Sequence, residues 1–189
     1  MADKDRSLSA FAKEFAKYST SAERSNDMVS SIEEILKRKL DNEEKLKLRL
    51  NIETFISLST IYTISCLNED GNKKKEFLSH YGEDTEKIFQ VFGGWSPERI
   101  KDYEGLKGVA SELFYKSLKG KVAPTQKDYE NLWDDFTYCI ITGLNFGPQV
   151  DAENEKQYNL LSKIIKLKLS ALTYEVKKKI QENIVLFFK

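Results

Sequence analysis

The chain has 189 residues, with 30 basic and 30 acidic side chains and a hydrophobic fraction of 40%. This apolar content is enough to fill a core and excludes wholesale disorder. The zero formal net charge argues against a protein that coats polyanions through bulk charge. Three prolines and nine glycines are too few for the many tight turns of an all-β protein. The sequence therefore predicts a single all-α domain over residues 1–189, a compact bundle of about eight helices.

Two amphipathic helices are expected first. An apolar stripe over residues 8–18 predicts a helix with one buried face. After a polar linker, Asn26 and Asp27 are the expected N-caps of a second helix, which ends at the basic residues 37–39.

Residues 46–67 fit two secondary structures. Apolar residues alternate over 46–52, as in a strand, whereas residues 55–67 place apolar side chains all around a helical wheel. We predict a buried central helix, because the neighbouring segments are helical and an isolated strand would have nothing to pair with. A partial strand remains the alternative.

Shorter helices and breaks follow. We expect a turn at 68–72 and two short helices, over 74–80 and 84–92. Ser96-Pro97-Glu98 has the order of an N-cap, a first-turn proline and an acid, so it predicts a helix start. A second break precedes a helix that begins at Thr125 and ends near residue 144. The likeliest seams of the domain lie near 68–73 and 119–125.

The last forty residues, 150–189, contain neither glycine nor proline and predict one long C-terminal helix. Two neighbouring apolar rows in its first half indicate burial over a wide face, and only one row continues beyond Tyr174. We expect a bend near Ser170–Thr173 and an apolar tail over 184–188. The rows consist of Leu161, Ile165, Leu169, Leu172, Val176 and Ile180, and of Leu160, Ile164, Leu167, Ala171 and Tyr174.

No catalytic or metal motif is present. His80 is the only histidine, and at the end of a short helix it is interpreted as a C-terminal cap. Asp134-Asp135, flanked by aromatic residues, is the best acidic candidate for a metal-dependent enzyme. Adjacent helix positions point about 100° apart, however, which favours an exposed helix edge. The paired acids at 33–34 and 43–44 are interpreted as solvated charge. We expect no cofactor and no bound metal, and the sequence favours a protein that is not an enzyme.

The N-terminal residues, the apolar runs and the cysteines bear on where in the cell the protein is found. Residues 1–15 lack the unbroken apolar core of a signal peptide, and no run approaches the ~20 apolar residues of a membrane span. Cys66 and Cys139 form no CxxC pair and sit among apolar residues. We expect both to be buried, reduced thiols in a soluble protein of the cytoplasm.

The sequence favours a function based on protein–protein contacts, as a regulator, an inhibitor or a subunit of an assembly or oligomer. The expected contact residues are the late stripe and tail of the C-terminal helix: Val176, Ile180, Ile184, Val185, Phe187 and Phe188. The first alternative is nucleic-acid binding by the basic segments 37–49 and 163–179. Its expected phosphate contacts are Lys37, Arg38, Lys39, Lys177, Lys178 and Lys179. The second alternative is an enzyme built on Asp134 and Asp135.

Overall fold

The computed structural model describes residues 7–65, 67, 71–91, 96–98, 126–144 and 152–187, with isolated positions at 101, 104, 105 and 108. Within these ranges, the side chains at 22, 65, 89–91, 126, 128, 152–154 and 184–187 are outside the description. The described helices are α1 (Leu8–Ser19), α2 (Ala22–Leu36), α3 (Asn42–Ser65), α4 (Gly71–Val91), α6 (Gln126–Gly143) and α7 (Ala152–Phe187). The all-α prediction is confirmed, whereas a count of about eight helices is not supported by these ranges.

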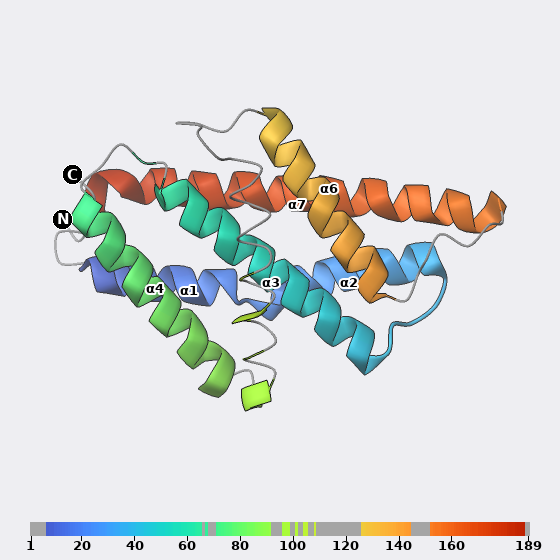
Figure 1. The fold of residues 1–189 in the computed structure, drawn as a ribbon, viewed down its shortest axis with the longest axis horizontal. Coiled ribbons are helices and arrows are strands. Elements are labelled where there is room, and N and C mark those ends of the chain that lie inside the picture. Colours follow the sequence, from blue (N-terminus) through green and yellow to red (C-terminus); the bar gives the residue numbers. More distant parts are fainter. Residues whose placement is uncertain are drawn as a thin grey trace.

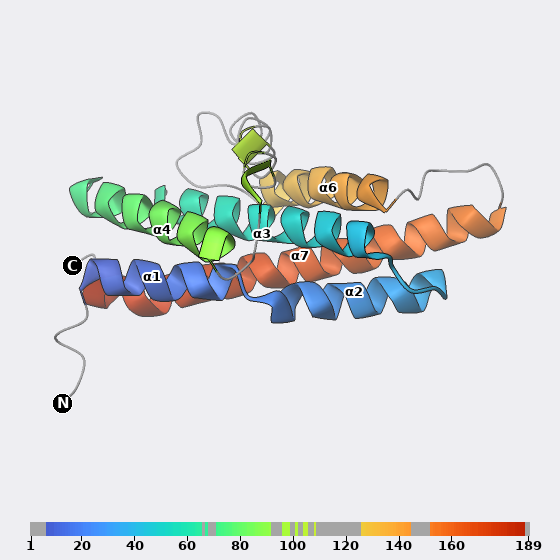
Figure 2. The same ribbon diagram turned by 90° about the horizontal axis from the view of Figure 1, so that it is seen from below.

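The helices form two layers. In Figure 2, α1, α2 and α7 lie in one layer, and α3, α4 and α6 lie in the other. Figure 1 shows α1 and α2 end to end beside α7, with the helices of the second layer crossing them obliquely. Helix α3 packs against α2, α4, α6 and α7, so it occupies the centre of the bundle.

Helix α3 settles the ambiguity of the sequence over residues 46–65 in favour of helix. Every residue from 51 to 60 is buried, although several are polar. Thr54 and Thr60 donate their hydroxyls to the carbonyls four residues earlier, Leu50 and Ile56, at 2.7 and 2.8 Å. These bonds satisfy the hydroxyls inside the helix, which lets a polar residue lie in the core at low cost.

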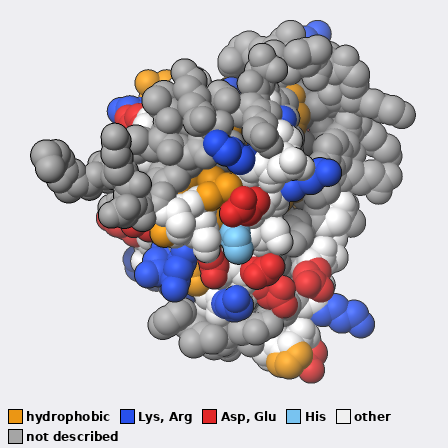
Figure 3. Space-filling view, turned by 90° about the vertical axis from the view of Figure 1, so that its left-hand side faces the viewer, with side chains coloured by type: hydrophobic (Ala, Val, Ile, Leu, Met, Phe, Trp, Pro, Cys, Tyr) orange, Lys and Arg blue, Asp and Glu red, His pale blue; other side chains and the backbone are white. Residues whose placement is uncertain are grey.

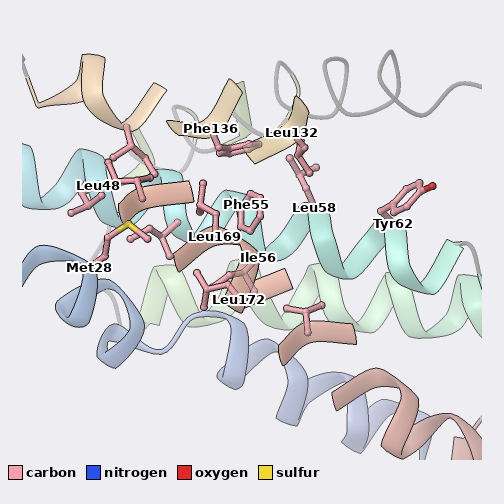
Figure 4. Close-up of a cluster of buried hydrophobic side chains, with 14 of the residues drawn as sticks. Met28, Leu48, Phe55, Ile56, Leu58, Tyr62, Leu132, Phe136, Leu169 and Leu172 are labelled. Atoms are coloured by element: carbon pink, nitrogen blue, oxygen red, sulfur yellow. The ribbon is translucent and has the colours of Figure 1, made fainter. Parts of the chain in front are cut away.

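Apolar side chains of α6 and α7 pack against α3, and a second group of aromatic side chains joins α1 to α4. Phe55 lies against Phe136 of α6 with ring centroids 5.1 Å apart. Figure 4 shows Phe55 and Ile56 of α3 among side chains of α6 and α7, including Leu169 and Leu172. On the other side, α1 packs along α4 through aromatic rings that include Phe11, Phe15, Phe77 and Tyr81.

Three boundaries differ from the predictions. Helix α2 begins at Ala22, with Ser21 as N-cap, rather than at Asn26 or Asp27. The expected short helices 74–80 and 84–92 are a single helix, α4, which also includes Gly71 and so begins inside the predicted turn. Gly82 is exposed within α4, where a glycine costs about 1 kcal/mol relative to alanine but does not end the helix.

Two glutamates, Glu33 and Glu44, hold the connection between α2 and α3. We predicted from the sequence that both would be solvated. Glu44 accepts a bidentate hydrogen bond from Arg38 at 2.7 and 2.8 Å and another from the Asp41 backbone N–H at 3.0 Å. Asp41 caps α3 in return, because its side chain accepts from the Glu44 N–H at 2.8 Å. Glu33 accepts from the Leu40 N–H at 3.0 Å. Glu33 and Glu44 are buried, so the interpretation as solvated charge is wrong for these two, whereas Glu34 and Glu43 are exposed as predicted.

Helix α7 runs without interruption from Ala152 to Phe187, about 54 Å at ~1.5 Å per residue. The helix has no sharp bend near Ser170–Thr173, where one was predicted. Figure 2 shows only a gentle curve along the whole of α7. Thr173 lies where the bend was expected, and it donates to the Leu169 carbonyl at 2.9 Å and accepts from Trp133 Nε1 at 3.2 Å. Within the described ranges, no helix is sufficiently long and apolar to cross a membrane.

Candidate functional site on the outer face of α7

Helix α7 presents a second apolar row to solvent, on the side opposite the core. Leu160, Leu167 and Tyr174 are 48%, 66% and 68% exposed, Ala171 is exposed, and Ile164 is half-buried. We call these five residues the outer row. Tyr138 of α6 is the one further large hydrophobic residue exposed to this extent in the described ranges. The expectation that this row is buried together with its neighbour is therefore wrong.

The helical period explains which row faces inward. Residues 161, 165 and 169 are fully buried against α3 and α6, and they lie about 100–180° around α7 from Leu160. The outer row repeats at steps of four and three residues, which is the spacing of a coiled-coil seam. Its members stay on one side of the helix for two heptads, so they form one continuous strip.

A groove of about 520 Å³ borders the outer row where α7 meets α2. Leu167 and Ala171 line it from α7, and Glu23 and Asp27 line it from α2. Asp27 accepts a 2.5 Å bond from Lys168, which ties the two helices together. The wall of the groove on the α2 side therefore carries two acidic side chains together with Arg24, next to the apolar strip.

The opposite flank of the outer row faces α6 and is basic. Lys156 and Lys163 are exposed, seven residues apart on the same side of α7. Further toward α6, Lys166 forms an ion pair with Asp134. Lys177 places its ammonium group over the Tyr129 ring, 3.5 Å from the centroid. The outer row is thus bordered by acid on its α2 side and by lysines on its α6 side.

The expected contact residues of the late stripe are placed differently. Val176 and Ile180 are 1% and 0% exposed and belong to the core of this chain, so they are not available on its surface. The reason is that α7 packs against α2, α3 and α6, and both side chains belong to the hydrophobic core that these helices share; Figure 2 shows α7 alongside α2 in one layer. The remaining members lie in or beyond the last turn of α7, outside the described side chains: Ile184, Val185, Phe187 and Phe188.

The lysines and arginine proposed for nucleic-acid binding are mostly matched by acids or rings. Arg38 and Lys39 pair with Glu44 and Glu33 at 2.7 Å each. Lys178 lies 3.9 Å from Glu182, and Lys179 lies over the Tyr18 ring. Lys37 is exposed, in a left-handed backbone conformation with φ of 52°.

The same mixing of charge recurs at the other lysines of segment 37–49. Lys45 and Lys47 lie 3.3 and 2.7 Å from glutamate carboxylates. In Figure 3, acidic and basic side chains are interspersed around the single histidine, His80. The segments 37–49 and 163–179 therefore present mixed charge where they are described, which is unfavourable for binding phosphates.

The acidic pair on α6 consists of two carboxylates with different exposure. Asp134 is on the surface, and Asp135 is half-buried, with its pKa raised by burial and by the neighbouring Asp134 carboxylate. His80 lies inside α4, so it does not cap a helix end as expected. Among the residues that the structure describes, no group of three metal-ligating side chains comes together. Cys139 is a half-buried free thiol whose pKa is raised by burial, and Cys66 lies outside the described residues.

One buried carboxylate was missed altogether by the sequence. Glu53 of α3 is 2% exposed, and burial raises its pKa to about 7. Its Oε1 accepts from Arg49 Nε at 2.6 Å, whereas its buried Oε2 has no hydrogen-bond partner. The Arg49–Glu53 spacing of four residues is visible in the sequence, but an exposed helical ion pair has the same spacing.

No family model, no curated protein and no solved structure matches this chain.

Proposed function

We propose that this protein acts by binding another protein chain through the outer row of α7, as a regulator, an inhibitor or a subunit of an assembly. The observation behind the proposal is the row itself: Leu160, Leu167 and Tyr174 stand exposed on one side of a helix whose other side is fully packed. Single exposed hydrophobic residues are ordinary on protein surfaces, but a contiguous strip is typical of a contact site.

The arrangement around the strip also favours a partner protein. Interfaces combine an apolar centre with a polar rim, and here acidic side chains of α2 on one side and lysines of α7 on the side facing α6 border the apolar strip. Tyrosine is enriched among the residues that dominate binding energy, and Tyr174 is the most exposed member of the row. A helix of a partner could lie along α7 with its own apolar positions against these residues.

Photo-crosslinking from a single position tests this proposal. A photoreactive amino acid replaces Leu167 in the full chain, produced in its native cells, and the adducts are separated by mass. Tyr138 provides the matched control, since it is exposed to the same extent (65% against 66%) but lies on α6 outside the row. We expect a discrete protein adduct from position 167 and none from 138. The absence of any protein adduct at 167, or equal adducts from both positions, would contradict the proposal.

A further inference from the structure

The geometry points to a second copy of this chain as the occupant of the outer row, with the two α7 helices parallel around a two-fold axis that runs along them. This inference rests on the proposed function and names the partner. Three features of the described residues support it: the spacing of the row, the polar residues at its ends, and the charges on its two flanks.

The row has the spacing and the length of a short two-stranded seam. From residue 160 to residue 174 the steps are four, three, four and three, so all five positions meet a straight neighbouring helix. The next seam position on either side is polar, Gln157 before the row and Lys178 after it. The apolar seam is therefore limited at its two ends to two heptads, a length of about 21 Å at ~1.5 Å per residue.

The lysines flanking the row share the same heptad register. Lys156 and Lys163 are exposed on the α6 side of the row, at the positions that directly precede Gln157 and Ile164 in the heptad register. In coiled coils, charges at these flanking positions select the partner and its direction. The lysine flank of one copy therefore requires an acidic flank on whatever chain lies opposite.

The required acids lie on α2 of this same chain. Glu23, Asp27 and Glu34 are exposed and fall on one side of α2, at steps of four and seven residues. Helix α2 runs antiparallel to α7, because Asp27 meets Lys168 and Arg24 lies near Glu175. Extending this pairing along the helices by their common rise places Glu34 level with residue 161.

Symmetry then distinguishes the two possible directions. A two-fold axis parallel to α7 turns the α6 flank of one copy onto the α2 flank of the other, so lysines face acids at both edges. In such a parallel pair, a lysine lies opposite the partner position five residues further on. Lys156 thus comes level with Glu34 of the second copy, and Lys163 comes level with the Asp27–Lys168 ion pair. An axis perpendicular to α7 would instead place acid against acid.

Oligomeric state as a function of concentration is the first test. We expect the full-length chain to change from monomer to dimer in sedimentation experiments between about 1 µM and about 1 mM, the range of weak to moderate affinities. Leu167→Glu should weaken the dimer at least about 10-fold, because it buries a charge in the seam, whereas Tyr138→Glu should change it less than about 2-fold. A chain that stays monomeric over this range, or a dimer indifferent to Leu167→Glu, overturns the inference. Helicity measured by circular dichroism verifies that each variant is folded.

Charge reversal tests the direction of pairing. One variant carries Lys156→Glu, and the other carries Glu34→Lys, the residue that lies level with Lys156 of the second copy. Each should dimerise more weakly than the parent, because both of its edges then bring like charges together. An equal mixture should restore a heterodimer, since each edge again joins opposite charges. If the mixture forms no heterodimer, parallel pairing is wrong.

Disulfide trapping gives an independent readout of direction. In a parallel pair, each seam residue lies beside the same residue of the second chain. Leu160→Cys and Tyr174→Cys, tested separately in a Cys66→Ser, Cys139→Ser background, should therefore each form a disulfide-linked dimer. In an antiparallel pair centred on Leu167, residue 160 would lie beside residue 174 of the other chain, so neither variant would form a disulfide-linked dimer. That result would overturn the inference. A discrete adduct of Leu167 to a different protein, with a monomeric chain, would refute self-pairing and leave the proposed function standing.

Discussion

Replacing the buried Glu53 by glutamine should make the protein more stable at neutral and alkaline pH. The side chain is 2% exposed, its Oε2 has no hydrogen-bond partner, and its pKa is raised to about 7 from an ordinary 4.5, mainly because burial penalises the charge. Glutamine has the same shape, retains an oxygen that can accept from Arg49 Nε, and cannot ionise.

The magnitude follows from the difference in pKa between the folded and unfolded chain. Between pH 4.5 and about 7 the folded protein retains the proton of Glu53 while the unfolded chain has lost it, so stability falls as the pH rises. Each factor of ten in proton affinity corresponds to ~1.4 kcal/mol, and the full displacement to roughly 3 kcal/mol. Glu53→Gln should therefore match the parent near pH 4.5 and exceed its free energy of unfolding by roughly 2–3 kcal/mol above pH 8.

Urea unfolding of the parent and the variant at a series of pH values measures this difference directly, because the titration of other groups cancels between the two proteins. Glu33→Gln is the matched control with the opposite sign. The hydrogen bond from Lys39, followed by that from the Leu40 N–H, holds the pKa of Glu33 down at about 2. Its contribution to stability is present above pH 4.5 and disappears as the pH falls toward 2. A stability difference for Glu53→Gln that stays constant across the pH series would refute the argument.

Three further predictions concern the helix boundary, the core and the free thiol. Asp41→Ala removes the N-cap of α3 and should lower the free energy of unfolding by about 1 kcal/mol in urea titrations. Ile180→Ala should cost about 2–5 kcal/mol at every protein concentration, because Ile180 lies in the core of its own chain; a loss that disappears on dilution would show that a partner buries it instead. Cys139 should react with iodoacetamide more slowly than a free thiol at the same pH, and Asp135→Asn should accelerate it, as followed by peptide mass spectrometry.

The fold class could be predicted because composition constrains it strongly, whereas element boundaries could not. Few glycines and prolines correctly indicated helices, and the small polar residues of α3 correctly indicated a buried helix. The break predicted between residues 80 and 84 does not occur in α4, although this stretch contains Gly82. Gly82 is exposed, with no atom within 4 Å of the position that a Cβ would occupy, so packing does not decide whether the helix stops there.

The buried acids at the α2–α3 connection show a second limit. Glu33 and Glu44 each lie beside another glutamate and close to lysines, a pattern that solvated helices share. Their burial depends on the chain turning back at Lys37, whose left-handed conformation brings residues 38–41 over both carboxylates. The capping pair Asp41 and Glu44 was the local signal that could have been recognised, since an acid three residues after an N-cap is a known helix start.

The contact residues predicted from the sequence include Val176 and Ile180, which the bundle buries, whereas the proposed site lies on the other apolar row of α7. Sequence periodicity shows that α7 has two apolar rows and cannot say which one faces its own chain, because both have the same spacing. The packing of the other helices against α7 decides which row is buried. Leu161, Ile165 and Leu169 are completely buried, and Thr173 accepts a hydrogen bond from Trp133. The outer row is therefore held on a helix that is already rigid. Because little conformational entropy would be lost there on association, a short strip of five residues can support specific binding.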